Sequence, residues 1–345
     1  MSNFTTKEIN SLVALLRYGL FGGPLPQVLP TSEAQWQSLY DLTRQQAITA
    51  LAYDAILRLP ADRRPPRKVL FHFTSLVQTI ESDNRQREKA LSDLATICNE
   101  RLGLQLTVVK GSSLASRYPK PLHRECGDND LFTGADTGRL KTLLESMGIA
   151  IDSKDPRHIA FVYENTTFEA HTYLLYHNDD PQWHSDQSHS AYSVLRPDEE
   201  AFFLAKHCEH HSVFFHNPVR LRTLIDWCLL LKTEGFDFAR FDRLKKGTDV
   251  EVFADLMTLY CNELFGVGLR NNTDMNLKNL GAADFEKIYM HCPERHKLAL
   301  VRVTRRSAKY ILYWRKYRMI YGQSMFRRFY FNNLKVAAKQ HRYRR

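Results

Sequence analysis

A change of hydrophobic pattern at Gly103 constrains the fold of this chain more than any other feature of its sequence. Up to about residue 102, apolar side chains recur every three or four positions, as in Ile9, Leu12, Leu15 and Leu16. This spacing places them on one face of a helix. After Gly103 the sequence turns to short runs rich in β-branched and aromatic residues. We therefore expect a helical region over residues 1–102 followed by a small unit that contains a sheet.

Breaker residues divide the first region into three predicted helices. Gly22-Gly23-Pro24 ends the first helix. The second begins after Ser32, a residue that favours the N-cap position, and is expected to continue to Leu57. Prolines at 60, 65 and 66 mark the next break, and the third helix is expected over 67–101.

The pattern after Gly103 predicts strands over 104–109 and 128–132, helices over 112–118 and 136–147, and a hairpin of 157–163 with 167–175. From Pro197 the chain reads as helical again. The sequence thus predicts an α+β protein, in which a small mixed-sheet core over 103–180 lies between helical regions at 1–102 and 181–345.

Two aspartates and a Gly-Ser pair give the middle unit a chemical character. Asp128 and Asp130 are two positions apart on an expected strand, so both side chains point to one face. Carboxylates so close repel each other unless a cation lies between them, and carboxylate oxygens are ligands that Mg²⁺ prefers. Gly111 allows the backbone to approach a phosphate, and Ser112 opens a helix whose free N–H groups attract anions.

Gly111-Ser112, a short helix and then Asp128-x-Asp130 resemble the signature of the polymerase-beta-like nucleotidyltransferase superfamily. The fuller pattern is similar to its uncharacterised bacterial nucleotidyltransferase family (NTP_transf_5 type). The matching motifs include Lys110-Gly111, Tyr118-Pro119, Gly127-Asp128, Phe168-Glu169-Ala170-His171, Ala205-Lys206-His207 and Leu221 to Asp226. The resemblance covers about residues 30 to 270.

The resemblance implies a reaction and a set of site residues. A hydroxyl would attack the α-phosphate of a nucleoside triphosphate and release pyrophosphate, with Mg²⁺ or Mn²⁺ as cofactor. Asp128 and Asp130 would bind the metal ions, and Glu169 would join one ion and help to deprotonate the acceptor hydroxyl. Glu164 in the same hairpin is the alternative third acid. Asn129 departs from the family pattern, which has an apolar residue there, and needs hydrogen-bond partners in the core.

Several other residues are candidates for the nucleotide site. Lys110 could contact the triphosphate or pair with an acid, and Arg124 could bind a phosphate or buttress the carboxylates. His171 shares a strand face with Glu169. His207 and His211 lie on one helical face, so we consider them, with His171, as cleft contacts. A zinc site at these histidines is the weaker alternative, because no third ligand is evident.

The positive charge of the chain is concentrated near its end. The formal net charge is +10, from 48 basic and 38 acidic residues, but residues 301–345 hold 14 Lys or Arg and no acid. The rest therefore has 48 − 14 = 34 basic against 38 acidic residues, a net of −4. This segment could bind RNA, another polyanion or an anionic lipid surface, or pack its aromatic residues on the acidic body.

The sequence leaves one alternative function open and lacks the motifs of several other classes of protein. The alternative function is a catalytically weak or inactive nucleotidyltransferase-fold protein that binds RNA or another polyanion through the basic C-terminal segment. The sequence contains no GxxxxGK[ST] or GxGxxG motif, no secretory leader and no apolar run long enough for a membrane span, which favours a cytoplasmic protein. The acceptor and the nucleotide base remain open.

Overall fold

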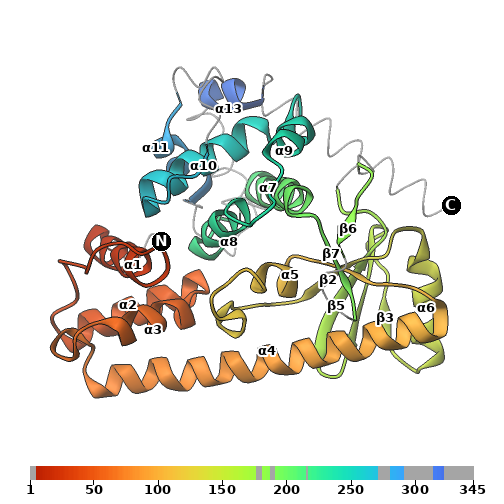
Figure 1. Cartoon of the computed structure of the whole chain (residues 1–345), viewed down its shortest axis with the longest axis horizontal. Helices are drawn as coiled ribbons and strands as arrows, with labels where there is room; N and C mark the ends of the chain where they lie inside the picture. Colours follow the sequence, from red (N-terminus) through yellow and green to blue (C-terminus); the bar gives the residue numbers. More distant parts are fainter. Residues whose placement is uncertain are drawn as a thin grey trace, which may run out of the picture.

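One long helix forms the base on which the other elements are arranged. The computed structural model describes residues 5–175, 181–186, 191–214, 217–270, 280–290 and 314–321. Helix α4 (Arg67–Leu102) has 36 residues and runs beneath both the N-terminal helices and the sheet (Figure 1). Its first half buries Val69 and Phe73 among helices, and its second half buries Leu91 and Leu94 beneath the sheet. The helix therefore fixes the position of the sheet relative to the helical part.

The described N-terminal region has three α-helices before α4, not two. They are α1 (Thr6–Leu20), α2 (Glu33–Gln46) and α3 (Thr49–Arg58). The expected single helix over 32–57 is therefore wrong. Ala47 ends α2 in a left-handed conformation with φ 55° and ψ 49°. This conformation is costly for a residue with a Cβ and is usually marked by glycine, so an alanine at this position is no local sign of the break.

A seven-stranded mixed sheet follows, which confirms the α+β class. Its strand order is β3-β4-β5-β2-β1-β7-β6. Strand β1 pairs with β2 antiparallel and with β7 parallel, β2 pairs with β5 parallel, and β4 and β5 form an antiparallel hairpin. The strands are β1 (Thr107–Val109), β2 (Asn129–Phe132), β3 (Ile151–Asp152), β4 (His158–Tyr163), β5 (Thr166–His171), β6 (Ser185–Asp186) and β7 (Ser193–Leu195).

Two helices complete the sheet unit, and two of its strands lie beyond the expected limit at residue 180. Helix α5 (Gly111–Ala115) follows β1, and helix α6 (Thr137–Ser146) packs with the end of α4 in the core beneath the sheet. Strands β6 and β7 belong to the same sheet because the chain returns after residue 180 to pair β7 beside β1. The sheet is therefore more extensive than the segment 103–180.

The helices after the sheet pack back on the N-terminal helices. They are α7 (Pro197–Phe214), α8 (Leu221–Leu231), α9 (Phe238–Lys245), α10 (Glu251–Phe265) and α11 (Ala282–Phe285), which continues as a π-helical turn to Met290. Arg17 of α1 donates to the carbonyls of Glu263 and Leu264, and the backbone N–H of Leu221 donates to Gln46. The N-terminal helices and the described helices after the sheet thus share one hydrophobic core.

Helix α13 (Trp314–Tyr321) is the described part of the basic C-terminal segment. Tyr317 and Ile320 are buried in the shared core, whereas Trp314 is 51% exposed. Lys316 forms an ion pair with Asp284. These contacts agree with the packing alternative for residues 314–321, and the rest of 301–345 lies outside the described residues.

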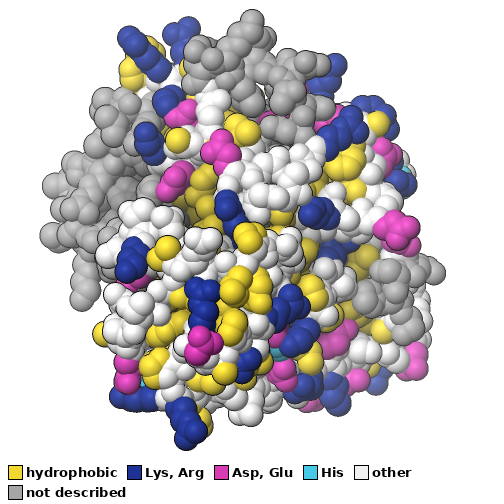
Figure 2. Space-filling model, turned by 60° about the vertical axis from the view of Figure 1, so that its left-hand side comes forward, with side chains coloured by type: hydrophobic (Ala, Val, Ile, Leu, Met, Phe, Trp, Pro, Cys, Tyr) yellow, Lys and Arg dark blue, Asp and Glu magenta, His cyan; other side chains and the backbone are white. Residues whose placement is uncertain are grey.

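Two further properties concern the charges on one face of the surface and the length and polarity of the described helices. On the face shown in Figure 2, basic and acidic side chains are interspersed. Among the described helices, none is both long enough and apolar enough to cross a membrane.

A buried histidine ties α4 to the loop that leads to β2. His123 is 3% exposed, and its Nδ1 and Nε2 lie 2.7 Å from Asp54 and 2.8 Å from Glu81. Burial alone would lower the pKa of His123, but the hydrogen bonds that its ring makes to the Asp54 and Glu81 carboxylates raise it above its ordinary value. The same contacts lower the pKa of Asp54, against its burial, and that of Glu81. A protonated imidazole can donate to both partners at once.

We expect the contribution of His123 to stability to depend on pH. Because its folded pKa is raised, the contribution is complete below the unfolded value of about 6.5 and is lost as pH rises through the folded pKa. His123→Gln should therefore destabilise the protein by about 1–2 kcal/mol near pH 6 and by clearly less near pH 9, measured by urea unfolding. His72→Gln is the control, because that ring contacts the neutral Gln37. An equal loss at both pH values would contradict the protonated bridge.

Candidate active site

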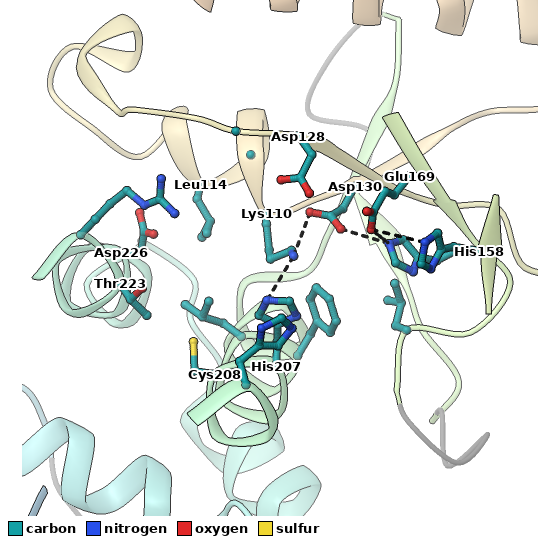
Figure 3. A pocket seen from close by; sticks show the side chains of 18 of the residues that line it. Lys110, Leu114, Asp128, Asp130, His158, Glu169, His207, Cys208, Thr223 and Asp226 are labelled. Atoms are coloured by element: carbon teal, nitrogen blue, oxygen red, sulfur yellow. Dashed lines mark hydrogen bonds and ion pairs between the residues drawn. The ribbon is translucent and has the colours of Figure 1, made fainter. Parts of the chain in front are cut away.

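A cavity of about 390 Å³ lies between the sheet and helices α7 and α8. Figure 3 shows the carboxylates of Asp128, Asp130 and Glu169 on the sheet side and His207 of α7 across from them. The cavity is also lined by Lys110, Gly111, Arg124, His158, His171, His211, Arg222 and Asp226. Most of the polar residues that were predicted for the site therefore line this cavity.

The three acids meet in the cavity because of strand register. Asp130 of β2 lies beside Glu169 of the parallel neighbour β5. Asp128 stands one residue before β2 and is exposed, whereas Asp130 is buried. Glu164, the alternative third acid, is at the exposed tip of the hairpin with φ 46° and does not line the cavity. The register thus brings Glu169 beside Asp130.

Two histidines adjoin the carboxylates. Nε2 of His171 is 3.0 Å from Oδ1 of Asp130 and 3.6 Å from Oε2 of Glu169. Nε2 of His158 is 3.9 Å from the same Glu169 oxygen, and the two rings are 5.0 Å apart. Ligand atoms of Asp130, Glu169 and His171 lie within 4.8 Å of one another, close enough to share a metal ion. His158 was not predicted as a site residue. The feature that could have indicated it is its position opposite His171 in the expected hairpin.

Lys110 is paired with an acid in this structure. Its Nζ lies 2.8 Å from Oδ2 of Asp130 and 3.5 Å from Nε2 of His207. Burial alone would lower the pKa of Lys110, but Asp130 and Asp128 raise it. Likewise, burial would raise the pKa of Asp130, but Lys110 and His171 hold it well below its usual range. The ammonium group of Lys110 therefore already neutralises part of the negative charge of the carboxylates.

The backbone around Lys110 is unusual. Lys110 has φ 58° and ψ −144°, and Gly111 has φ 41°. A positive φ in a residue with a Cβ stores conformational strain, and such residues cluster at functional sites. A Cβ at position 111 would lie 3.4 Å from Oδ1 of Asn129, so glycine allows this close approach. Asn129 is fully buried, but the expected hydrogen-bond partners are not found among the described residues.

Ser112 does not line the cavity, unlike Gly111 and Leu114 on either side of it. A helix turns by about 100° per residue, so residues 111 and 114 share a face that residue 112 does not. The prediction for Ser112 concerned the free backbone N–H groups at the start of its helix, and it stays a prediction.

Arg124 buttresses the wall of the cavity. Its Nε and Nη2 donate to the two oxygens of Asp226 at 2.7 and 2.9 Å, and Nη1 donates to the Gly111 carbonyl at 3.3 Å. Tyr118 donates to Asp226 at 2.6 Å, and burial beside that carboxylate raises the pKa of Tyr118 well above its usual value. Arg124 is 4% exposed. Its donors are thus directed to Asp226 and to the turn at Gly111, so Arg124 supports the cavity wall at Asp226 and not at the carboxylates that it was expected to buttress.

His207 and His211 form a stacked pair on α7. Their ring centroids are 4.1 Å apart with planes inclined by 27°. Burial and the nearby Lys110 lower the pKa of His207 well below its usual range and that of His211 to about 4. Both rings are therefore neutral at pH 7. In the described part of the chain they belong to no group of three metal-ligating side chains, so the zinc alternative gains no support.

Comparison with known protein families agrees with this geometry. A family described as an uncharacterised nucleotidyltransferase matches residues 32–266, well over half of the chain. No curated protein and no solved structure matches. The matched range begins before α2 and ends just after α10, so it includes every residue that lines the cavity. The chain therefore belongs to this family of uncharacterised nucleotidyltransferases.

Proposed function

We propose that the protein transfers a nucleoside monophosphate group from a nucleoside triphosphate to a hydroxyl acceptor, with a divalent metal ion as cofactor. The observation that carries this proposal is the convergence of Asp128, Asp130 and Glu169 in one cavity beside the Lys110-Gly111 turn. The family match supports the same reaction class. A volume of about 390 Å³ is in the range of small-molecule sites.

The donor set at the sheet fits a divalent cation. Asp130 and Glu169 offer carboxylate oxygens and His171 an imidazole nitrogen within 4.8 Å of one another, and Asp128 adds a carboxylate at the mouth. A bound Mg²⁺ or Mn²⁺ would supply Lewis-acid stabilisation of the phosphate oxygens. The acids provide the negative charge that holds such an ion next to a polyanionic substrate.

The other cavity residues would bind and orient the substrate. Lys110 can donate to a phosphate oxygen, since its ammonium group lies in the cavity wall, and the Gly111 backbone allows a phosphate to approach closely. The neutral rings of His207 and His211 can contact the nucleotide or the acceptor without adding charge. Arg124 acts as a positioning residue, through Asp226 and the Gly111 carbonyl.

Glu169 is suited to receive the acceptor proton. Its side chain is 30% exposed, whereas that of Asp130 is 5% exposed and held by Lys110 and His171. In the proposed step the hydroxyl oxygen forms a bond to the α-phosphorus, the bond from that phosphorus to the bridging oxygen breaks, and pyrophosphate leaves. The hydroxyl proton passes to Glu169.

An experiment with two positions of label tests the reaction class. The protein is incubated with each nucleoside triphosphate, labelled at the α- or the γ-phosphate, with Mg²⁺ or Mn²⁺ and a cell lysate as acceptor source. We expect the α-label to appear on an acceptor and the γ-label in pyrophosphate, and Asp128→Asn should abolish both. Transfer of the γ-label would identify a kinase instead, and no transfer with any triphosphate would contradict turnover.

A further inference from the structure

We propose that His171 is a ligand of the catalytic metal ion and that its imidazole makes the site select a first-row transition-metal ion, with Mn²⁺ as the representative, over Mg²⁺. The inference rests on the proposed function, since it concerns the ion that would serve that reaction. It departs from an all-carboxylate site in two respects, the identity of a ligand and the class of metal.

The first argument is that two carboxylates converge on one nitrogen. Nε2 of His171 faces Oδ1 of Asp130 at 3.0 Å and Oε2 of Glu169 at 3.6 Å. A ring nitrogen carries at most one proton, so it can donate a full hydrogen bond to only one of these oxygens. A cation among the three atoms would interact favourably with all of them.

The second argument is the spacing of the ligand atoms. Two ligands at right angles around an ion, each about 2.1 Å from it, are about 3.0 Å apart, and the tetrahedral value is about 3.4 Å. The observed separations of 3.0 and 3.6 Å are close to these values. Asp130 is fixed by its strand, and the half-buried Glu169 can close the remaining gap by a small rotation.

The third argument is that Asp130 presents its two oxygens to different groups. Oδ2 is held by Lys110 at 2.8 Å, and Oδ1 faces His171. A metal ion can therefore bind on the His171 side while Lys110 keeps its ion pair with Asp130. His171 is 8% exposed and is held in β5 opposite Phe132, so its ring is already placed for this role.

Ligand chemistry then determines the class of metal. Mg²⁺ takes oxygen ligands and keeps several waters, whereas imidazole suits first-row metals such as Fe, Ni, Cu and Zn. Mn²⁺ stands at the weak end of that series and also suits carboxylates, so a gain of affinity for Mn²⁺ from His171 that Mg²⁺ does not share is the most demanding case of the proposed selectivity. His158 lies on the neighbouring strand β4, 3.9 Å from Glu169, and adds a second imidazole to the surroundings of the same carboxylate.

The test uses the full-length protein and Mn²⁺ without nucleotide. Pulsed electron paramagnetic resonance of the bound ion should show ¹⁴N coupling from a directly bound imidazole in the wild type and in His211→Gln, but not in His171→Gln. His211 is the control because it is a cavity histidine outside the ligand cluster. Bound Mn²⁺ without ¹⁴N coupling in the wild type would overturn the proposal, even if His171→Gln fails to fold.

Affinities give the second readout. Loss of even an outer partner of a metal ligand costs about 10–100-fold in affinity, so His171→Gln should weaken Mn²⁺ binding by at least about tenfold. Mg²⁺ binding, measured by competition, should change by less than about threefold, because glutamine offers an oxygen in place of the nitrogen. An unchanged ratio of the two affinities would overturn the selectivity. If label transfer persists in that case, only this inference fails; if neither ion binds, the proposed function fails with it.

Discussion

Asp128→Asn should abolish metal-dependent nucleotide binding and reduce transfer by at least about a hundredfold while leaving the fold intact. Metal ions stabilise such transition states by several kcal/mol, and each 1.4 kcal/mol or so corresponds to about tenfold in rate. The fold should survive because Asp128 is exposed, and Lys110 keeps its ion pair with Asp130. The substitution also removes one of three neighbouring negative charges, so the metal-free melting temperature should be at least that of the wild type.

Thermal unfolding with and without metal and nucleotide measures this prediction. Ligand at about a hundred times its Kd stabilises a protein by about 2.7 kcal/mol, and this gain should vanish in the variant. Glu164→Gln is the matched control, because it removes an acid from the exposed tip of the neighbouring hairpin, outside the cavity. If Asp128→Asn kept the full ligand-induced stabilisation, Asp128 would not be a metal ligand.

The long helix shows which parts of the fold local sequence can predict. Helix α4 was expected over 67–101 and is found at Arg67–Leu102. Pro66 precedes it, Gly103 ends it in the left-handed conformation with φ 60°, and its apolar spacing is regular between them. The break between α2 and α3 had no such markers. It occurs at Ala47 and is supported by distant contacts, since Gln46 accepts from Leu221 and Thr49 donates to Glu125.

In the candidate site, too, local sequence predicts some features and not others. Asp128, Asp130 and Glu169 could be predicted because they lie in short motifs with a fixed order along the chain. The distances between these carboxylates could not be predicted, because they depend on the register of β2 beside β5, which joins segments that are 39 residues apart. The ion pair of Lys110 with Asp130 depends in turn on the register of β1 beside β2, and the approach of His158 to Glu169 on that of β4 beside β5. A single sequence carries no local pattern for either contact.

Asp226→Ala should cause the largest loss of stability among the cavity substitutions, about 3–5 kcal/mol, because it leaves the Arg124 guanidinium buried without its partner. Asp226 is 2% exposed and also accepts from Tyr118. The loss is measured by urea unfolding, and Asp136→Ala, which removes the partner of the exposed Arg139, is the control and should have little effect.

Nucleotide binding by the folded Asp226→Ala protein also tests the role of Arg124. If Arg124 were a phosphate ligand held back by Asp226, freeing it would tighten nucleotide binding. If it positions the Gly111 turn, to whose carbonyl it donates, binding should weaken, because a guanidinium released from Asp226 no longer fixes that turn. Nucleotide titration of the folded variant gives the sign. Since Arg124 directs three nitrogens to these two partners, we expect weaker binding, and tighter binding would make Arg124 a substrate ligand.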